Sequence, residues 1–192
     1  MKTFAPIAAA LILLAVPAVA QQAPAPSSNA EMMRIFAEDQ GDRAAPNIDW
    51  RVVAPRDEQR RAATRKLLAD GALHTGEDYN AAAFVFQHGG DANDYLLAHT
   101  LAVVAVAKGE RKAAWIASAT LDRYLMQIGQ PQILGTQYMF HKQPQATWTQ
   151  EPYARDLISD ALRKELGVPV QAEQAERMAK MPLPIPANAP KP

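Results

Sequence analysis

Residues 91–108, DANDYLLAHTLAVVAVAK, decide the fold class of this chain. Asp91 is a typical N-cap, and Asp94, three residues later, suits the positive end of a helix dipole. Residues 95–107 are apolar on nearly every side, which is typical of a helix at the centre of a core. Gly109 then ends the pattern. The stretch therefore predicts a central helix in a mainly α domain.

Helical patterns also flank this stretch. Thr75 and Asp78 form a capping-box pattern that starts one helix, and Gly129 closes another over residues 110–128. Residues 45–53 have no helical pattern and are expected to form a loop. Further helices with recognisable boundaries are predicted at residues 29–40, 55–70, 153–166 and 171–181.

The short connections between these helices favour irregular stacked helical hairpins. The arrangement is tetratricopeptide-like at most, because no fixed repeat period links the helices. Residues 138–140 and 146–148 are runs with aromatic residues on either side of a polar turn, which predicts a short β-hairpin near residues 136–149. We expect one helical domain over residues 29–181.

The first 20 residues have the three parts of a secretory signal peptide. Lys2 is the positive charge, and residues 4–16 are an apolar run that is short for a membrane-spanning helix. Ala18-Val19-Ala20 is a small-x-small cleavage motif. An uncleaved anchor helix is the alternative. We expect a signal peptide over residues 1–20, cleavage after Ala20, and a periplasmic or secreted product.

Composition limits the classes of function. The chain has 20 basic and 20 acidic residues, and cleavage would remove only Lys2 from these, so no nucleic-acid or anionic-membrane partner is expected. The absence of cysteine excludes disulfides, a cysteine nucleophile, thiolate metal ligands and a bacterial lipid anchor. After signal cleavage, no apolar stretch is long enough to span a membrane. Clustered prolines predict a disordered linker over residues 21–28 and a disordered tail over residues 182–192.

Three side chains are candidates for chemistry in a chain without the common catalytic motifs. His88 follows a buried helix and precedes two glycines, so it is either an acid, base or anion contact, or an ordinary helix-end residue. Asp122 shares a helical face with apolar residues and must be paired. It is either catalytic or part of a structural salt bridge that clamps the following loop. His99 lies in the apolar run and is expected to be a core histidine with a satisfied hydrogen bond. No histidine pair has metal-ligand spacing, and no metal or cofactor is expected.

The loop over residues 129–137 contains three glutamines, a threonine and two glycines. Amide and hydroxyl groups suit neutral polar ligands such as sugars or peptides, and they suit the loop's own backbone equally well. Long irregular loops in compact domains are often functional. Together with the nearby Arg123, the candidate binding residues are Gln132, Thr136 and Gln137.

Four polar segments of this chain also resemble a known pattern; they are Gln87-His88-Gly89, Asp122-Arg123, Gly129-Gln130-Pro131-Gln132 and Gly135-Thr136-Gln137. In this order they resemble a bacterial domain family of unknown function with the signature Asp-Arg … Gly-x-Pro-Gln-x-x-Gly-Thr-Gln. Residues 163–169 are similar to the Arg-x-x-Leu-Gly-Val/Leu-Pro segment that closes the family pattern. The resemblance spans residues 55–181. It implies a helical domain whose polar residues belong together, and it implies no reaction.

Three functions agree with these observations. The first is a non-enzymatic exported domain that binds a protein, a peptide or an envelope component. The second is a hydrolase of an envelope or extracellular polymer, with His88 as acid or base, Asp122 as its partner, and Gln132, Thr136 and Gln137 holding substrate. The third is a purely structural polar network that fixes the loop onto the helices.

Overall fold

The computed structural model describes residues 26–44, 46–143 and 145–183. These residues form seven helices and one two-stranded sheet, which confirms a mainly α fold with a short β-hairpin. The elements are, in chain order, α1 (Ala30–Arg43), α2 (Trp50–Ala69), α3 (Gly76–Phe86), α4 (Ala92–Ala107), α5 (Ala113–Gln127), β1 (Met139–His141), β2 (Thr147–Thr149), α6 (Asp160–Glu165) and α7 (Gln171–Ala179).

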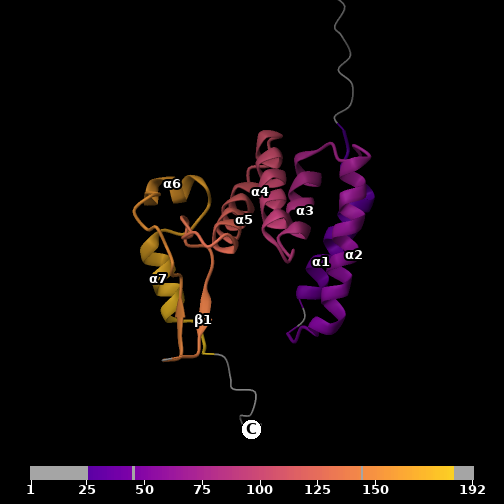
Figure 1. Ribbon diagram of the computed structural model, residues 1–192. Coiled ribbons are helices and arrows are strands. Elements are labelled where there is room, and N and C mark those ends of the chain that lie inside the picture. Colours follow the sequence, from indigo (N-terminus) through magenta and orange to yellow (C-terminus); the bar gives the residue numbers. More distant parts are fainter. Residues whose placement is uncertain (1–25, 45, 144, 184–192) are drawn as a thin grey trace, which may run out of the picture.

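From α3 onward the elements are stacked in sequence order, and α1 and α2 both pack against α3. Figure 1 shows α1 and α2 at one side, then α3, α4 and α5, and finally the hairpin with α6 and α7 at the other side. The most extensive helix contacts are those of α4 with its chain neighbours α3 and α5. The fold therefore consists of a helical stack whose last helix, α5, carries a smaller C-terminal layer.

α1 extends beyond its predicted end. Gly41 was expected to stop the helix, but α1 continues to Arg43. Arg43 donates a 3.0 Å hydrogen bond to Asp39 one turn earlier and a 2.6 Å bond to Asp57 on α2. These two contacts hold the last turn in place and outweigh the helix-weakening effect of a single glycine, which is about 1 kcal/mol.

α2 starts five residues before its predicted beginning at Pro55, so the prediction of a loop over residues 45–53 is wrong for its last part. The Asp49 side chain accepts a 3.1 Å hydrogen bond from the backbone N–H of Arg51 and caps the additional turn. Pro55 therefore lies inside the helix rather than at its first position. Trp50, which was expected in the loop, is the first helical residue.

The predicted starts of α3 and α4 are confirmed. Thr75 accepts a hydrogen bond from the N–H of Asp78, and the Asp78 carboxylate accepts one of 2.9 Å from the N–H of Thr75. Asp78 also accepts from the N–H groups of His74 and Asn29, which ties the start of α1 to the start of α3. Burial alone would raise the pKa of Asp78, but these backbone hydrogen bonds hold it below its ordinary value. α4 begins after its predicted cap, Asp91.

The hydrophobic core lies between α1, α3, α4 and α5. Met32, Phe86 and Ile116 are its large, fully buried members. Around them the helices present mainly alanines, and such small side chains allow neighbouring helices to pack at short distances. The buried alanines of this cluster are Ala81, Ala82, Ala83, Ala98, Ala102, Ala105, Ala113 and Ala117.

α4 is not buried on all sides, which corrects the expectation drawn from its apolar sequence. Val103 is 48% exposed and Val106 is 38% exposed, because α3 and α5 cover only part of the helix surface. Trp115 on α5 and Ile128, directly after its last residue, are likewise large apolar side chains that are exposed by more than 40%. A uniformly apolar helix in this chain therefore includes a water-facing side.

The C-terminal layer contains the predicted hairpin but less helix than predicted. β1 pairs antiparallel with β2, and Phe140 lies opposite Trp148 with their ring centroids 5.3 Å apart. The predicted helix over residues 153–166 is wrong in its first half. α6 spans only Asp160–Glu165, while Tyr153 forms a parallel bridge to Gln132 in the loop after α5.

In the part of the chain that the structure describes, no helix is long and apolar enough to cross a membrane. The predicted signal peptide over residues 1–20 lies outside the described residues, as do most of the predicted linker and tail. Ser28, at the end of the predicted linker, belongs to the folded domain. Its hydroxyl donates a 2.7 Å hydrogen bond to Glu77 and lies 3.0 Å from the hydroxyl of Thr75.

Candidate functional site

The carboxylate of Asp122 joins α5 to the loop that follows it. Its side chain is fully buried. Oδ1 accepts hydrogen bonds from the N–H groups of Ile133 (2.8 Å) and Leu134 (3.0 Å). Oδ2 accepts from the N–H (2.9 Å) and the hydroxyl (2.8 Å) of Thr136. These donors offset the cost of burying the charge and leave the carboxylate closed to a substrate. The clamp predicted for Asp122 is thus made of hydrogen bonds rather than a salt bridge.

The side chain of Gln132 forms hydrogen bonds with the backbone of the same loop and of a neighbouring segment. It is fully buried, its Oε1 accepts a 3.0 Å hydrogen bond from the N–H of Gln137, and its Nε2 donates to the carbonyl groups of Gln137 and Gln150. The polar groups of Gln132 and Thr136 are therefore engaged inside the domain. Neither presents a free amide or hydroxyl hydrogen to a ligand.

Two later segments complete this loop network, and neither was selected from the sequence. Gln150, next to β2, donates a 2.6 Å hydrogen bond to the carbonyl of Gly135. Gln174 on α7 donates a 2.8 Å hydrogen bond to the carbonyl of Leu134. Both glutamines are 1% exposed, although α7 is otherwise a polar helix. A single buried amide on a polar helix leaves no periodic signal in the sequence.

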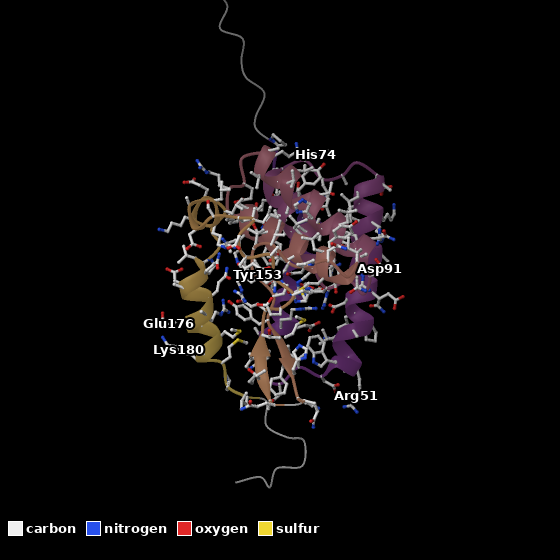
Figure 2. The ribbon with its side chains drawn as sticks, turned by 60° about the vertical axis from the view of Figure 1, so that its left-hand side comes forward. Arg51, His74, Asp91, Tyr153, Glu176 and Lys180 are labelled. Carbon is white, nitrogen blue, oxygen red and sulfur yellow. The ribbon has the colours of Figure 1, made fainter. Side chains whose placement is uncertain are left out.

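Arg163 on α6 is the largest fully buried side chain of the described residues. It donates a 2.7 Å hydrogen bond to the hydroxyl of Tyr153, which in turn lies 3.2 Å from Oε1 of Gln174. Figure 2 shows Tyr153 in the interior of this layer, whereas Glu176 and Lys180 lie on the outer side of α7. One sequence feature could have drawn attention to Arg163. It is the first residue of the segment over residues 163–169 that resembles the end of the bacterial family pattern.

Gly135 is the point at which the loop network is tightest. Its φ of +73° is a conformation that residues with a side chain rarely adopt. A Cβ atom at this position would lie 2.2 Å from Oε1 of Gln174 and 2.5 Å from the hydroxyl of Tyr153. Only glycine therefore fits at this position in the loop.

His88 lies in a different network from Asp122. Its Nδ1 is 3.0 Å from Oδ1 of Asp39 on α1, and its carbonyl accepts a 2.9 Å hydrogen bond from Arg61 on α2. Asp39 is buried and also pairs with Arg43 at 3.0 Å. Among the described residues no hydrogen bond joins His88 to Asp122. The structure thus does not provide the direct pairing on which the hydrolase hypothesis depends.

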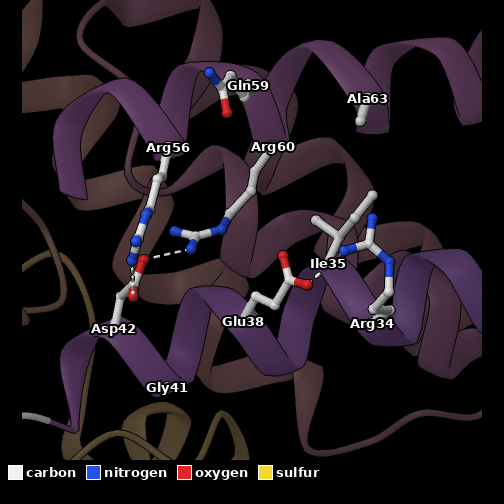
Figure 3. Close-up of a pocket in the computed structure, with 9 residues that line it drawn as sticks. All are labelled: Arg34, Ile35, Glu38, Gly41, Asp42, Arg56, Gln59, Arg60 and Ala63. Carbon is white, nitrogen blue, oxygen red and sulfur yellow. Dashed lines mark hydrogen bonds and ion pairs between the residues drawn. The ribbon is translucent and has the colours of Figure 1, made fainter. Parts of the chain in front are cut away.

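A cavity of about 640 Å³ lies between α1 and α2, and its walls are charged (Figure 3). Asp42 on α1 pairs with Arg56 at 2.9 Å and with Arg60, both on α2. The hydrogen bond from Arg60 is the main reason that the pKa of Asp42 is held below its ordinary value. Arg34 pairs with Glu38 along α1. Arg60 also pairs with Asp57 at 2.9 Å. Among the described residues that line the cavity, each charged side chain therefore already has an ion-pair partner, and none is left unpaired to select a ligand.

A second cavity, of about 390 Å³, lies between α4 and α5 and has almost entirely apolar walls. Val103 and Val106 belong to its α4 side, and Leu121 belongs to its α5 side. Leu134 from the clamped loop and Leu166 at the end of α6 close it. The remaining lining residues are His99, Ala107, Ala114, Ala117 and Ser118. We call this hollow the α4–α5 cavity.

His99 contributes a ring nitrogen, Nε2, that has no hydrogen-bond partner among the described residues. Its Nδ1 lies 2.9 Å from the carbonyl oxygen of Ala117, so the predicted hydrogen bond is formed, but the ring is half-buried at the cavity and is not part of the core. A carbonyl only accepts, and Nδ1 must therefore carry the proton, which leaves Nε2 of the neutral ring as an acceptor. Ser118 uses its hydroxyl within α5, where it donates a 2.9 Å bond to Ala114.

Arg123 and Gln137, two of the predicted binding residues, do come together. They line a small hollow of about 270 Å³ with Tyr95, Met126 and Gln127. Gln132 and Thr136, the other two, are part of the loop network described above. The four predicted binding residues are thus divided between an accessible hollow and a closed structural network.

The described residues contain no group of three or more histidine, aspartate or glutamate side chains that could hold a metal ion. No family model, curated protein or solved structure matches the chain. The resemblance to the bacterial domain family therefore stays a prediction, and functional inference rests on the geometry of the cavities and networks.

Proposed function

We propose that this protein is a non-catalytic binding domain that holds an apolar group of a peptide or envelope component in the α4–α5 cavity. The observation that carries the proposal is the combination of a 390 Å³ apolar hollow with one available polar atom, Nε2 of His99. Ligand pockets typically have volumes of about 300–1,000 Å³, apolar walls and a few placed polar groups. The α4–α5 cavity has each of these properties.

The chemistry of the walls limits the ligand. Removing apolar surface from water contributes about 25 cal/mol per Å², so the cavity favours a hydrocarbon or aromatic group. Nε2 of His99 accepts a hydrogen bond and favours a ligand with a hydroxyl or amide N–H beside that group. A neutral amphipathic group therefore fits this cavity better than a charged one.

The exposed valines at the mouth of the cavity support the same proposal. Val103 and Val106 lie next to each other on the outer side of α4, where a helix usually carries polar residues. Contiguous exposed apolar surface in a folded domain commonly marks a binding region. A ligand in the cavity would cover part of both side chains.

An apolar fluorescent probe tests the proposal directly. We expect saturable binding to the wild-type chain, and we expect Val103→Asp to weaken it at least about tenfold, because a charge at the mouth disfavours apolar ligands. Val52→Asp is the matched control, since Val52 is 45% exposed on α2, compared with 48% for Val103. Equal probe binding by both variants, or no saturable binding by the wild type, would contradict the proposal.

The role of His99 needs a separate variant. His99→Phe keeps a ring but removes the acceptor, so it should weaken a hydroxyl-bearing ligand more than the same ligand without its hydroxyl. A titration of both ligands against wild type and variant measures this difference. Equal losses for the two ligands would exclude a hydrogen bond to Nε2.

The polar residues around Asp122 fit a structural role, as in the third sequence-based hypothesis. Their hydrogen bonds are directed at the backbone of the loop, and the buried carboxylate has no open side. The hydrolase alternative has less support, since His88 is bonded to Asp39 instead. Loss of a measured hydrolytic activity in a folded His88→Ala variant would restore that alternative.

We also propose that the protein acts outside the cytoplasm as a periplasmic or secreted protein. The support is the charged, apolar and small-residue pattern of residues 1–20. The intact mass of the product should correspond to a chain that begins at Gln21. A mature product that retains residues 1–20 would refute cleavage at Ala20.

A further inference from the structure

We infer that Arg123, with Gln137, forms a binding site for the free carboxylate at the end of a peptide. This site is separate from the α4–α5 cavity and does not rest on the function proposed for that cavity. We call the 270 Å³ hollow lined by Tyr95, Arg123, Met126, Gln127 and Gln137 the Arg123 hollow. Its volume suits a terminal residue rather than a large ligand.

The first observation is an unsatisfied donor. The Nε–H of Arg123 is buried and has no hydrogen-bond partner among the described residues. Burying an N–H without an acceptor destabilises a fold, and native structures usually supply a partner. No carboxylate in the described part of the chain forms an ion pair with Arg123. The side chain as a whole is only half-buried and lines the hollow, so a carboxylate from outside the chain would neutralise the charge from the hollow side of the guanidinium.

The second observation is the neutral character of the surroundings. The other described residues of its lining, Tyr95, Met126, Gln127 and Gln137, carry no charge, so Arg123 supplies the one charge among them. A carboxylate carries one negative charge and matches the planar fork of the guanidinium. A phosphate at neutral pH carries nearly two negative charges and would leave one of them without a counter-charge. The site is therefore matched to a carboxylate.

The third observation fixes the orientation of Gln137. Its Nε2 donates to the carbonyl of Ala119 (3.2 Å) and to the hydroxyl of Thr136 (2.9 Å). Both amide hydrogens are therefore used, and Oε1 is left as an acceptor. A donor next to the bound carboxylate would meet this oxygen. The last residue of a peptide has such a pair, since its amide nitrogen is bonded to the same α-carbon that bears the carboxylate.

The Arg123 hollow opens on a different side of α5 from the α4–α5 cavity. Successive residues of a helix are about 100° apart, so Arg123 points about 200° away from Leu121, which lines the other cavity. Occupation of one site therefore does not block the other. A variant of one site serves as a control for ligand binding at the other.

The experiment uses the full chain and three probes: N-acetyl-dialanine with a free carboxylate, its C-terminal amide, and acetate. The ¹H–¹⁵N resonance of the Arg123 Nε–H is assigned by its absence in Arg123→Lys. We expect the free acid to shift this resonance saturably. The amide should bind at least about tenfold more weakly, because it lacks the charge. Acetate should also bind at least about tenfold more weakly, because it offers no N–H to Gln137.

Calorimetry on variants provides the second readout. Arg123→Gln should weaken binding of N-acetyl-dialanine at least about tenfold, whereas Arg111→Gln, at an exposed arginine, should leave it unchanged. Arg123→Gln should not lower the melting temperature, since the Arg123 side chain makes no hydrogen bond or ion pair in the described part of the chain. Equal binding of acid and amide, acetate binding as tight as that of the peptide, or full binding by Arg123→Gln would each overturn the inference.

Discussion

Thr136 contacts the carboxylate of Asp122 twice, through its backbone N–H at 2.9 Å and through its hydroxyl at 2.8 Å, and both bonds end on Oδ2. A hydroxyl and an N–H from one residue therefore fix the direction of the loop as well as its position. Oδ1 holds the two residues at the beginning of the same turn. One side chain of α5 thus determines the path of the chain after the helical stack.

Asp122→Asn should destabilise the domain strongly. The amide nitrogen of asparagine would face backbone donors, and each buried donor left unsatisfied costs about 1–3 kcal/mol. We expect the free energy of unfolding to fall by about 3 kcal/mol or more, measured by urea denaturation. Asp156→Asn is the control, since Asp156 is exposed, and its effect should stay within about 0.5 kcal/mol. A neutral Asp122→Asn would exclude the structural role of this carboxylate.

Gly135→Ala and Gly129→Ala form a matched pair. The two glycines have φ values of +73° and +75°, so alanine has a similar backbone cost at both, roughly 1–2 kcal/mol. At Gly129 no atom of the described residues lies within 4 Å of an added Cβ, whereas at Gly135 the Cβ would meet Gln174 and Tyr153. Gly135→Ala should therefore lose about 1–3 kcal/mol more than Gly129→Ala. Equal melting temperatures would refute this close packing.

Asp39→Asn probes the network that contains His88. Asp39 is buried and pairs with Arg43 and His88, and removal of one partner from a buried ion pair costs about 3–5 kcal/mol. We expect a loss near the lower limit, because Arg43 keeps its 2.6 Å bond to Asp57. Chemical denaturation measures the loss, with the exposed Asp156→Asn as reference. A change below about 0.5 kcal/mol would show that the buried pair does not hold α1 in place.

Asp78 should make the stability of the domain depend on pH in acid. Its pKa is lowered in the folded state, so the folded protein binds fewer protons at this carboxyl than the unfolded chain does. The stabilisation is fully present above the unfolded pKa of roughly 3.9 and is lost as the pH falls through the folded pKa. Asp78→Asn should be less stable at neutral pH and lose less stability below about pH 4 than the wild type.

Urea denaturation at a series of pH values from about 7 to 2 tests this expectation. Asp156→Asn should keep the wild-type pH profile, because its exposed carboxyl makes no hydrogen bond in the described part of the chain. If Asp78→Asn and the wild type had parallel profiles, the backbone hydrogen bonds to Asp78 would not lower its pKa. The same series measures the stabilising effect of the capping box at neutral pH.

The predictions from sequence were most accurate where structure is decided by neighbours in the chain. The capping box of Thr75 and Asp78 and the cap at Asp91 act over three residues, and the structure has both. The hairpin followed from two aromatic runs around a turn. The predictions were wrong where tertiary contacts determine the structure. Arg43, for example, forms a hydrogen bond to Asp57 on another helix, and this contact extends α1 past a glycine.

The site residues divide in the same way. Asp122 was recognisable as a carboxylate on an apolar helix face, which requires partners. The partners of Asp122 could not be predicted, because they are mainly backbone N–H groups, which are present at nearly every residue and carry no sequence signal. The burial of Gln174 was also not predictable, since it depends on contacts with a loop 40 positions earlier in the chain. The exposure of Val103 was also not predictable, because an apolar sequence does not specify how many neighbours surround a helix.

The hydrogen bond between Gln174 and Leu134 also leads us to expect a particular order of folding. α3, α4 and α5 contact their chain neighbours and bury the alanine-rich core through short sequence separations, which favour rapid assembly. The carbonyl of Leu134, in contrast, accepts its hydrogen bond from Gln174, which lies 40 positions further along the chain. Pulsed hydrogen exchange should therefore show protection of the amides of α4 before those of Ile133 and Leu134, as expected if docking of the last helix completes folding.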